Sequence, residues 1–327
     1  MRQQIFRGVF LACLLTILTC PAFSKDDDKN LSKAYGFYLK GLIADHYSEP
    51  DKALKQYLNL KNLDNSSISA RIQIAVDYIK INEYDKAIEV LEEAKKLDSE
   101  SLDVYILLVL IYTAQGKNDL ASKEYEVFLN RAYALEPENI KVIEYLAQFK
   151  LKKTQYDEAK LLYERIVKEK PDYVDAYFWL GYISEETSQR EQAVSYWKKA
   201  LDLDPEQPDV LNSLGYVYAE NGENLDEAEA MVKKALSIYP GNPAYLDSLG
   251  WVYYKKGDLE QALTALTNAS SVLKDGVIFD HLGDVYHSLG EIDKAVEKWE
   301  DALSIGGIDK EKMLEKIKKA KDGTKKF

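Results

Sequence analysis

Three polar residues of this sequence have the spacing of metal ligands on one helix. Asp280, Asp284 and His287 follow one another at steps of four and three residues. Such steps place side chains on one helix face, and two carboxylates with an imidazole suit several divalent metals. A straight helix rarely brings three of its own side chains onto one ion, however, and a solvated acidic face has the same spacing. We therefore predict neither a metal nor a cofactor.

No group of residues has the pattern of an active site. The sequence has no G-x-S-x-G elbow, no glycine-rich phosphate loop and no H-E-x-x-H motif. Glu185 and Glu186 are adjacent, so on a helix they point about 100° apart and cannot face one substrate. His46 and His281 are interpreted as isolated surface or core histidines. We predict a protein that is not an enzyme.

The N-terminus has the features of a secretory signal. Residues 1–24 contain two arginines, no acid, an apolar run over residues 8–20 and small residues before a cleavage point after Ser24. The apolar run is too short to span a bilayer comfortably. The alternative is a lipoprotein anchored at Cys20, although the residues ahead of Cys20 fit that pattern poorly. We predict a periplasmic or secreted protein.

The amino-acid composition excludes some classes of binding partner and of membrane attachment. The formal net charge is −12, which argues against nucleic acid or an anionic membrane as the ligand. Both cysteines, Cys13 and Cys20, lie in the predicted signal, so the mature chain would carry no thiol. No later hydrophobic stretch is long enough to be a transmembrane segment.

The elements that position these residues follow from a repeat of about 34 residues. A small residue precedes most of the repeating alanines by twelve positions, and a bulky residue follows them by four. Such steps of three and four mark one helical stripe, and the period is typical of paired antiparallel helices. Small residues are expected to face small residues where two helices cross. The alanines are Ala53, Ala87, Ala121, Ala159, Ala193, Ala228, Ala262 and Ala295.

These residues resemble the tetratricopeptide-repeat family. The match is closest at Leu249-Gly250-Trp251-Val252-Tyr253 followed by Gly257-Asp258-Leu259-Glu260-Gln261-Ala262-Leu263. The resemblance covers about residues 34–307 and implies an all-α, right-handed superhelical solenoid of about eight antiparallel helix pairs. Glycines such as Gly116, Gly257 and Gly290 are expected to adopt the left-handed conformation between the two helices of a pair. The third unit is the weakest, because Val109 replaces the small residue and four residues are inserted near residues 129–135.

The predicted organisation has five parts. A signal peptide at 1–24 and a short polar segment at 25–33 precede units 1–3 at 34–139 and units 4–8 at 140–307. Residues 308–327 form a capping helix and basic tail, because an end repeat needs a polar outer surface. The apolar face of this helix is predicted to hold Ile308, Met313, Leu314 and Ile317, with Lys310, Lys312, Lys316, Lys318 and Lys319 elsewhere.

The family's concave groove, lined mainly by the first helix of each pair, implies two sets of candidate residues. In the C-terminal half these are Phe178, Tyr182, Asn212, Tyr216, Asp247, Trp251, Tyr254, Asp280, Asp284 and His287, an aromatic trough edged with acids. In the N-terminal half they are the more apolar Tyr35, Tyr38, Leu42, Ile72, Val76, Ile79, Ile106 and Leu110. Tyrosine and tryptophan are frequent anchors at protein interfaces, but such rings also pack between repeats, and both interpretations stay open.

We predict a non-catalytic scaffold or adaptor that binds a peptide, helix or domain of another cell-envelope protein in this groove. Tyr182, Tyr216 and Trp251 stand where the family's carboxylate-binding subtype would place asparagines, so a free acidic C-terminus is an improbable ligand. The alternatives are a self-associating array and the binding of carbohydrate or cell wall by the rings. A partner helix, a second copy of the chain or residues 25–33 would cover the N-terminal apolar set.

Overall fold

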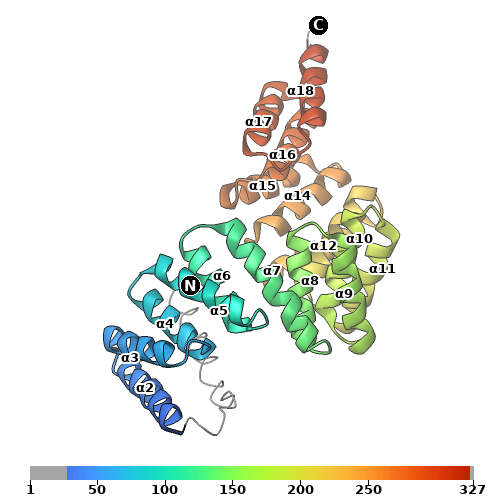
Figure 1. Cartoon of the computed structure of the whole chain (residues 1–327). Helices are drawn as coiled ribbons and strands as arrows, with labels where there is room; N and C mark the ends of the chain where they lie inside the picture. The colour runs from blue at the N-terminus through green and yellow to red at the C-terminus, as the bar shows by residue number, and fades with distance from the viewer. Residues whose placement is uncertain (1–27, 325–327) are drawn as a thin grey trace. The chain divides into compact units, whose positions relative to one another are not determined.

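The computed structural model describes residues 28–324, and these residues form helices joined by short turns with no strand among them (Figure 1). The chain divides into two compact units, residues 1–137 and 138–327. In the described part of the chain, no helix has the length and apolar character of a membrane span. The predicted signal, Cys20 and the cleavage point at Ser24 lie outside the described residues.

In the first unit, the described residues from 28 onward form three helical hairpins. The two helices of each hairpin pack together, and α3 and α5 also contact the first helix of the next hairpin. The first helix begins before residue 34, where the first repeat is predicted to start. The four additional residues of the third repeat lengthen its second helix, which has 18 residues where α3 and α5 have 14. The helices are α2 (Asp28–His46), α3 (Pro50–Leu63), α4 (Ile68–Lys80), α5 (Tyr84–Leu97), α6 (Leu102–Ala114) and α7 (Asn118–Leu135).

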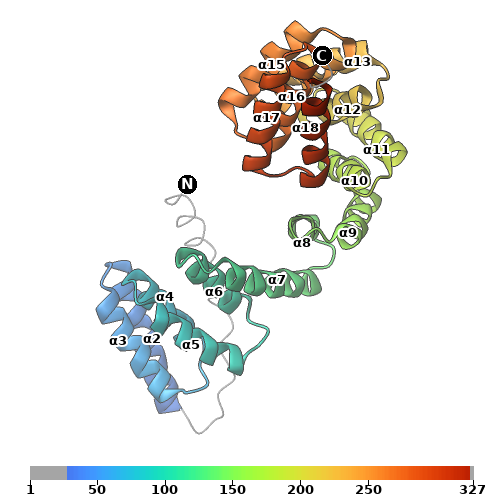
Figure 2. The same cartoon turned by 90° about the horizontal axis from the view of Figure 1, so that it is seen from above.

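In the second unit, the described residues up to 324 form five hairpins followed by a single helix. Within it, α9, α11 and α13 lie on the outside of a curve, and α10 and α12 lie on the inside (Figure 2). The helices are α8 (Ile140–Lys152), α9 (Tyr156–Glu169), α10 (Val174–Glu186), α11 (Arg190–Leu203), α12 (Pro208–Asn221), α13 (Leu225–Ile238), α14 (Pro243–Lys256), α15 (Leu259–Val272), α16 (Gly276–Ser288), α17 (Ile292–Ile305) and α18 (Lys310–Thr324).

The repeating alanines form the core of each hairpin. All eight are buried, which confirms that they mark the inner face of each second helix. The small residue of the first helix does more than face this alanine. A Cβ added to Gly181 would lie 2.3 Å from the Trp197 ring, and one added to Gly283 would lie 2.3 Å from the Trp299 ring. The glycines therefore make room for the bulky residue four positions after the alanine, which corrects the expectation that small simply faces small.

The turn within each hairpin requires one residue in the left-handed region. Gly116, Gly257 and Gly290 have φ values of 71°, 82° and 78°, which confirms their predicted conformation. Glycine adopts these angles without a Cβ clash. Four other hairpins place a residue with a side chain at the same point, namely Ser48, Asn82, Thr154 and Ser188.

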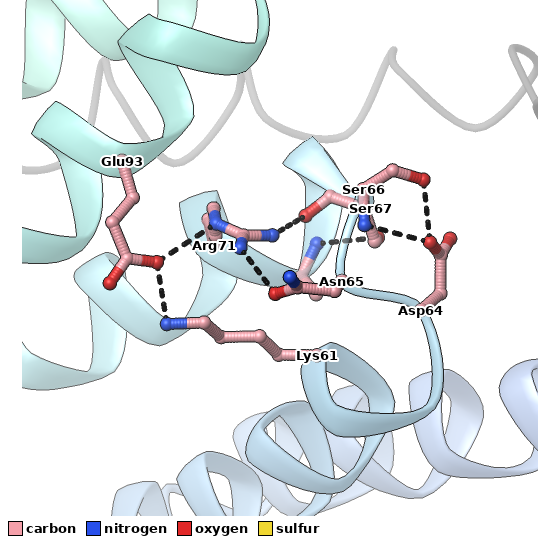
Figure 3. A network of polar contacts seen from close by, with 8 residues as sticks. Lys61, Asp64, Asn65, Ser66, Ser67, Arg71 and Glu93 are labelled. Carbon is pink, nitrogen blue, oxygen red and sulfur yellow. Dashed lines mark hydrogen bonds and ion pairs between the residues drawn. The ribbon is translucent and has the colours of Figure 1, made fainter.

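A polar network fixes the turn between α3 and α4 in the first unit (Figure 3). The Arg71 guanidinium is buried and donates to the Ser67 carbonyl at 3.1 Å and to Asn65 Oδ1 at 3.0 Å. Its Nε donates to Glu93 Oε2 on α5 at 3.1 Å, and Lys61 Nζ contacts the same oxygen at 2.6 Å. The hydrogen bond from Lys61 helps to lower the pKa of Glu93. One buried arginine therefore ties the turn to the following hairpin.

The last helix, α18, packs on the eighth hairpin. Met313 and Ile317 are buried against Trp299, and Ile308 before the helix packs partly against this cluster. The prediction was wrong for Leu314, which is 49% exposed. A helix of this kind covers an apolar face that a helical hairpin would otherwise leave open.

Candidate functional site

The residues predicted to line the groove of the second unit all lie on the first helices of hairpins. Neighbouring first helices are in contact, α12 with α14 and α14 with α16. Their side chains differ in exposure, which separates residues that hold repeats together from residues that face solvent. Asp247 and Trp251 are buried, Phe178, Asn212, Tyr216, Tyr254, Asp280 and Asp284 are half-buried, and Tyr182 and His287 are exposed.

Trp251 on α14 joins three consecutive hairpins. Its Nε1 donates a hydrogen bond of 2.5 Å to Glu220 on α12, and its ring stacks on His281 of α16 with centres 4.0 Å apart. Tyr254 also stacks on this ring, at 4.8 Å between centres. Only 7% of Trp251 is exposed, so of the two interpretations left open for this ring the structure favours packing. It is a packing residue between repeats.

Asp247 and His281 form a buried pair across one repeat. His281 Nδ1 lies 2.9 Å from Asp247 Oδ1, and the two residues are 34 positions apart. Burial alone would lower the pKa of His281, but the charge and hydrogen bond of Asp247, together with the charges of Asp280 and Asp284, outweigh burial and raise this pKa above its ordinary value. The interpretation of His281 as isolated is therefore corrected. The signal in the sequence that could have predicted this pair is the spacing of 34 residues between Asp247 and His281, which is one repeat length.

The acids at the end of the predicted trough are paired within the protein. Lys316 of α18 contacts Asp280 at 2.5 Å and Asp284 at 2.6 Å, and Trp299 Nε1 donates to Asp284 at 3.1 Å. Burial raises the pKa of Asp284, although Lys316 acts in the opposite direction. His287 lies beside the Trp299 ring, 5.6 Å between centres. In the described part of the chain, no three of His, Cys, Asp and Glu group as metal ligands would.

An aromatic cluster on α10 reaches the surface at Tyr182. The Trp179 ring lies edge-to-face with Phe178 at 4.9 Å and with Tyr182 at 5.7 Å, and it stacks on the buried Tyr163 ring of α9 at 6.4 Å. Burial raises the pKa of Tyr182 to about 12, so this hydroxyl is neutral and can donate a hydrogen bond at physiological pH. Tyr182 is 37% exposed. Trp179, whose ring contacts both of these neighbours, was not among the residues predicted from the sequence.

The middle of the surface is semi-polar. Tyr216 is half-buried, and its ring centre lies 6.4 Å from that of His281. Burial and the nearby acids raise the pKa of Tyr216, which keeps its hydroxyl protonated. Asn212 Oδ1 is a buried atom that accepts no hydrogen bond from the described residues. The three aspartates predicted at the edge of this surface are paired within the chain, and Glu185 and Glu220 lie near Tyr216.

Most of the apolar set predicted in the first unit contributes to packing. Ile72, Val76, Ile79 and Leu110 pack partly against the core of the second and third hairpins, and Tyr38 packs near Tyr57. Ile106 is half-buried. The remaining two, Tyr35 and Leu42 on α2, are 43% and 37% exposed. Residues 28–33, part of the segment considered as a cover for this set, belong to α2 itself.

Sequence models of the repeat match both units of the chain. A model described as TPR repeat matches residues 186–222, and one described as tetratricopeptide repeat matches residues 146–189. A further tetratricopeptide-repeat model matches residues 68–101 and 208–242. With the alternating helices and buried alanines, these matches define the chain as a tetratricopeptide-repeat protein.

Curated relatives share parts of the repeat array. The chain is 31% identical over 67 residues to the probable biofilm formation methyltransferase WspC of Pseudomonas putida, and 34% identical over 68 residues to the peroxisomal targeting signal receptor of Saccharomyces cerevisiae. These matches cover 20% and 21% of this chain. It is 27% identical over 180 residues, 53% of this chain, to cellulose synthase operon protein C of Pseudomonas fluorescens. The matches span 16%, 11% and 14% of these relatives' own lengths.

Solved structures share the fold. A tetratricopeptide repeat protein from Parabacteroides merdae superposes with a TM-score of 0.58 at 19% identity, over 77% of this chain and 98% of the other. The APC/C heterotetramer Cut9–Hcn1 gives a TM-score of 0.57 at 18% identity, over 93% of this chain and 58% of the matched chain. At these identities the likeness concerns the helical-hairpin fold.

Proposed function

We propose that this protein is a non-catalytic scaffold whose second unit binds a peptide, a helix or a domain of another protein on its first helices. The observation that carries the proposal is the row of rings left partly open there, Phe178, Tyr182, Tyr216 and Tyr254. Rings of this kind give a large contact area at low entropic cost, and they are frequent anchors at interfaces.

The chemistry of this surface favours a partner with apolar or aromatic anchors. Asp247, Asp280 and Asp284 are each paired with a base of the same chain, so they offer little attraction to a basic peptide. The names of two similar proteins agree with a binding role, since one is a receptor for a targeting signal and the other forms a heterotetramer. The proposal rests on the rings and does not depend on these names.

The test compares two tyrosines of the second unit. In affinity capture from the native envelope fraction, Tyr182→Ala is expected to weaken recovery of the partner severalfold. Tyr239→Ala is the matched control, because Tyr239 is 56% exposed after α13 and belongs to no first helix. Equal recovery by both variants would remove the support for this surface. Binding of the wild-type chain to a glycan array, lost in Tyr182→Ala, would favour carbohydrate instead.

The site of action is proposed to be the bacterial cell envelope. The N-terminal sequence supports export, and the similarity to a cellulose synthase operon protein agrees with it. The mass of the protein purified from its own cells is the test. A chain that begins at Lys25 supports cleavage after Ser24, and a lipid-modified chain that begins at Cys20 supports the anchored alternative. A chain of full length in the cytoplasm contradicts both.

A further inference from the structure

The imidazole of His281 lies where the seventh hairpin, α14 and α15, meets the eighth, α16 and α17. The first helices of these hairpins are in contact within the second unit (Figure 1). His281 of α16 stacks on the Trp251 ring of α14, with centres 4.0 Å apart and planes 19° apart. Tyr254 stacks on the same indole at 4.8 Å and 17°. The histidine is therefore part of the contact that joins the two hairpins.

Three carboxylates act on this imidazole. Asp247 of α14 is the nearest, with 2.9 Å between its Oδ1 and His281 Nδ1. The other two, Asp280 and Asp284, belong to α16 itself. Lys316 of α18 contacts both of these aspartates and offsets part of their charge. Asp247 is therefore the carboxylate that links the histidine to the preceding hairpin.

The polar neighbours on α12 and the rest of α14 have balanced charges. Tyr216 of α12 lies beside His281, 6.4 Å between ring centres, and burial raises the pKa of Tyr216, so its hydroxyl is neutral. The Glu220 carboxylate accepts a hydrogen bond from Trp251 Nε1, and the Lys255 ammonium lies over the same indole at 4.9 Å. These last two charges are opposite and offset each other.

Protonation of His281 strengthens its contacts with α14. Both His281 and Asp247 are buried, so water screens their charges little. An imidazolium attracts the Asp247 carboxylate and also the face of the Trp251 indole. A neutral imidazole with its proton on Nδ1 still donates to Asp247, but both attractions of charge are lost. Asp247 is then a buried charge without a cationic partner, which is costly.

We propose that His281 is a pH-dependent switch between the seventh and eighth hairpins, which holds them together firmly as an imidazolium and more weakly as a neutral imidazole. Burial lowers the pKa of His281, but Asp247, with Asp280 and Asp284, raises it above the ordinary value of 6.5. The contribution of this histidine to stability is therefore complete below about 6.5 and is lost as the pH rises through the raised pKa. The switch acts within the chain, so it does not depend on the proposed binding surface.

NMR titration of the full-length chain tests the protonation of His281. The chain has three histidines, and the other two, His46 and His287, are exposed. Substituting each of these by glutamine leaves the core intact and assigns the His281 signal by elimination. This signal is expected to titrate above pH 6.5. A His281 that titrates at or below this value overturns the proposal, and the result does not require any change to the buried pair.

A double-mutant cycle tests the contact between the hairpins. Wild type, His281→Gln, Asp247→Asn and the double variant are unfolded by heat at pH 5.5, and again two pH units above the titration point found by NMR. Tryptophan fluorescence follows the second unit alone, because all four tryptophans lie there. At pH 5.5 the double variant is expected to lose much less melting temperature than the two single losses combined, since it leaves no buried charge unpaired.

At the higher pH the single losses are expected to be smaller and to add, because His281 is neutral there. The control cycle joins His287→Gln with Asp247→Asn and is expected to be additive at both pH values. Titration of Asp77 in the first unit is common to all the chains and cancels in the cycle. Equal coupling of His281 and Asp247 at both pH values would show a hydrogen bond without a switch, and additivity at both would show no contact; either result overturns the proposal.

Discussion

In several hairpins, a glycine of the first helix packs against a large ring of the second helix where the two helices cross. In α2 the distinction between two glycines is sharp. A Cβ on Gly41 would lie 2.4 Å from the Tyr57 ring, and a Cβ on Gly36 would meet nothing within 4 Å. Tyr57 cannot retreat easily, because it is buried and its hydroxyl donates to Asp45 Oδ2 at 2.8 Å. The same substitution should thus have opposite effects five residues apart.

Gly41→Ala is expected to destabilise the first unit by about 1 to 3 kcal/mol, because the methyl group overpacks the crossing. Gly36→Ala is expected to stabilise the same helix by about 0.5 to 1 kcal/mol, because alanine loses less backbone entropy. Urea unfolding of both variants measures the difference. Two variants that change stability in the same direction would contradict the role assigned to the Gly41–Tyr57 contact.

A buried acid stands where most repeats have an aliphatic residue. Asp77 on α4 is fully buried, and its Oδ1 accepts a hydrogen bond of 2.8 Å from Lys80, which also pairs with Asp45. Its Oδ2 accepts no hydrogen bond from the described residues. Burial raises the pKa of Asp77 to about 7, with a further contribution from Asp45 and against the effect of Lys80. The protonated form is therefore favoured by folding.

A raised pKa fixes the sign of the pH dependence. The contribution of Asp77 to stability is complete below its unfolded pKa of about 4 and is lost as the pH rises through about 7. Asp77→Asn removes the charge and is expected to stabilise the first unit at pH 8 by about 1 to 3 kcal/mol. The gain shrinks toward pH 5, where Asp77 is itself protonated. Thermal unfolding of both proteins at the two pH values measures this, and a gain that is equal at both would refute it.

At the scale of the helix and its turn, each hairpin has at least one residue in the left-handed region between its two helices. Thr154 between α8 and α9 has a φ of 56°, where a β-branched side chain is strained. Gly257 takes the same place between α14 and α15, with φ of 82° and open space around it. A side chain placed at Gly257 would therefore meet no neighbour, so the two turns differ in backbone strain and not in contacts at this position.

Thr154→Gly is expected to raise stability by about 0.5 to 1 kcal/mol, since the strain removed exceeds the entropy that glycine adds to the unfolded chain. Gly257→Thr, the reciprocal change, is expected to lower stability by a similar or larger amount. Both are measured by thermal unfolding. A destabilised Thr154→Gly would show that the threonine contacts outweigh the strain.

The helices could be predicted from the sequence because the period repeats eight times and each repeat confirms the others. The alanine spacing predicted the buried stripes, and the inserted residues of the third repeat appear as the longer α7. Pairings between repeats were harder to foresee. Asp247 with His281 and Asp280 with Lys316 each lie about one repeat apart, but only the stacking of hairpins brings them together.

The candidate site was predicted less completely for the same reason. The sequence placed Tyr182 and Trp251 at equivalent positions of two repeats, yet one is exposed and the other is buried. The difference comes from neighbours: Trp251 is held by Glu220 and His281 from the adjoining hairpins. Exposure depends on three helices at once, so the spacing along one helix does not determine it.

At the scale of the whole molecule, stacked hairpins leave two kinds of open surface. The first helices of the second unit carry partly open rings, and α2 of the first unit exposes the apolar residues Leu39 and Ile43. A repeat array buries its core through contacts between neighbours alone. Residues beyond those contacts can therefore serve a partner without cost to the fold.

Site-specific photo-crosslinking in the cells that make the protein tests the central claim most directly. A photoreactive phenylalanine analogue is placed at position 182, in the open part of the aromatic cluster, and in separate chains at the exposed positions 161 and 239. Our account predicts a discrete crosslinked partner from position 182 and none from the two controls. Crosslinks from 161 or 239 with none from 182 would show that the partner binds elsewhere, and would contradict the account.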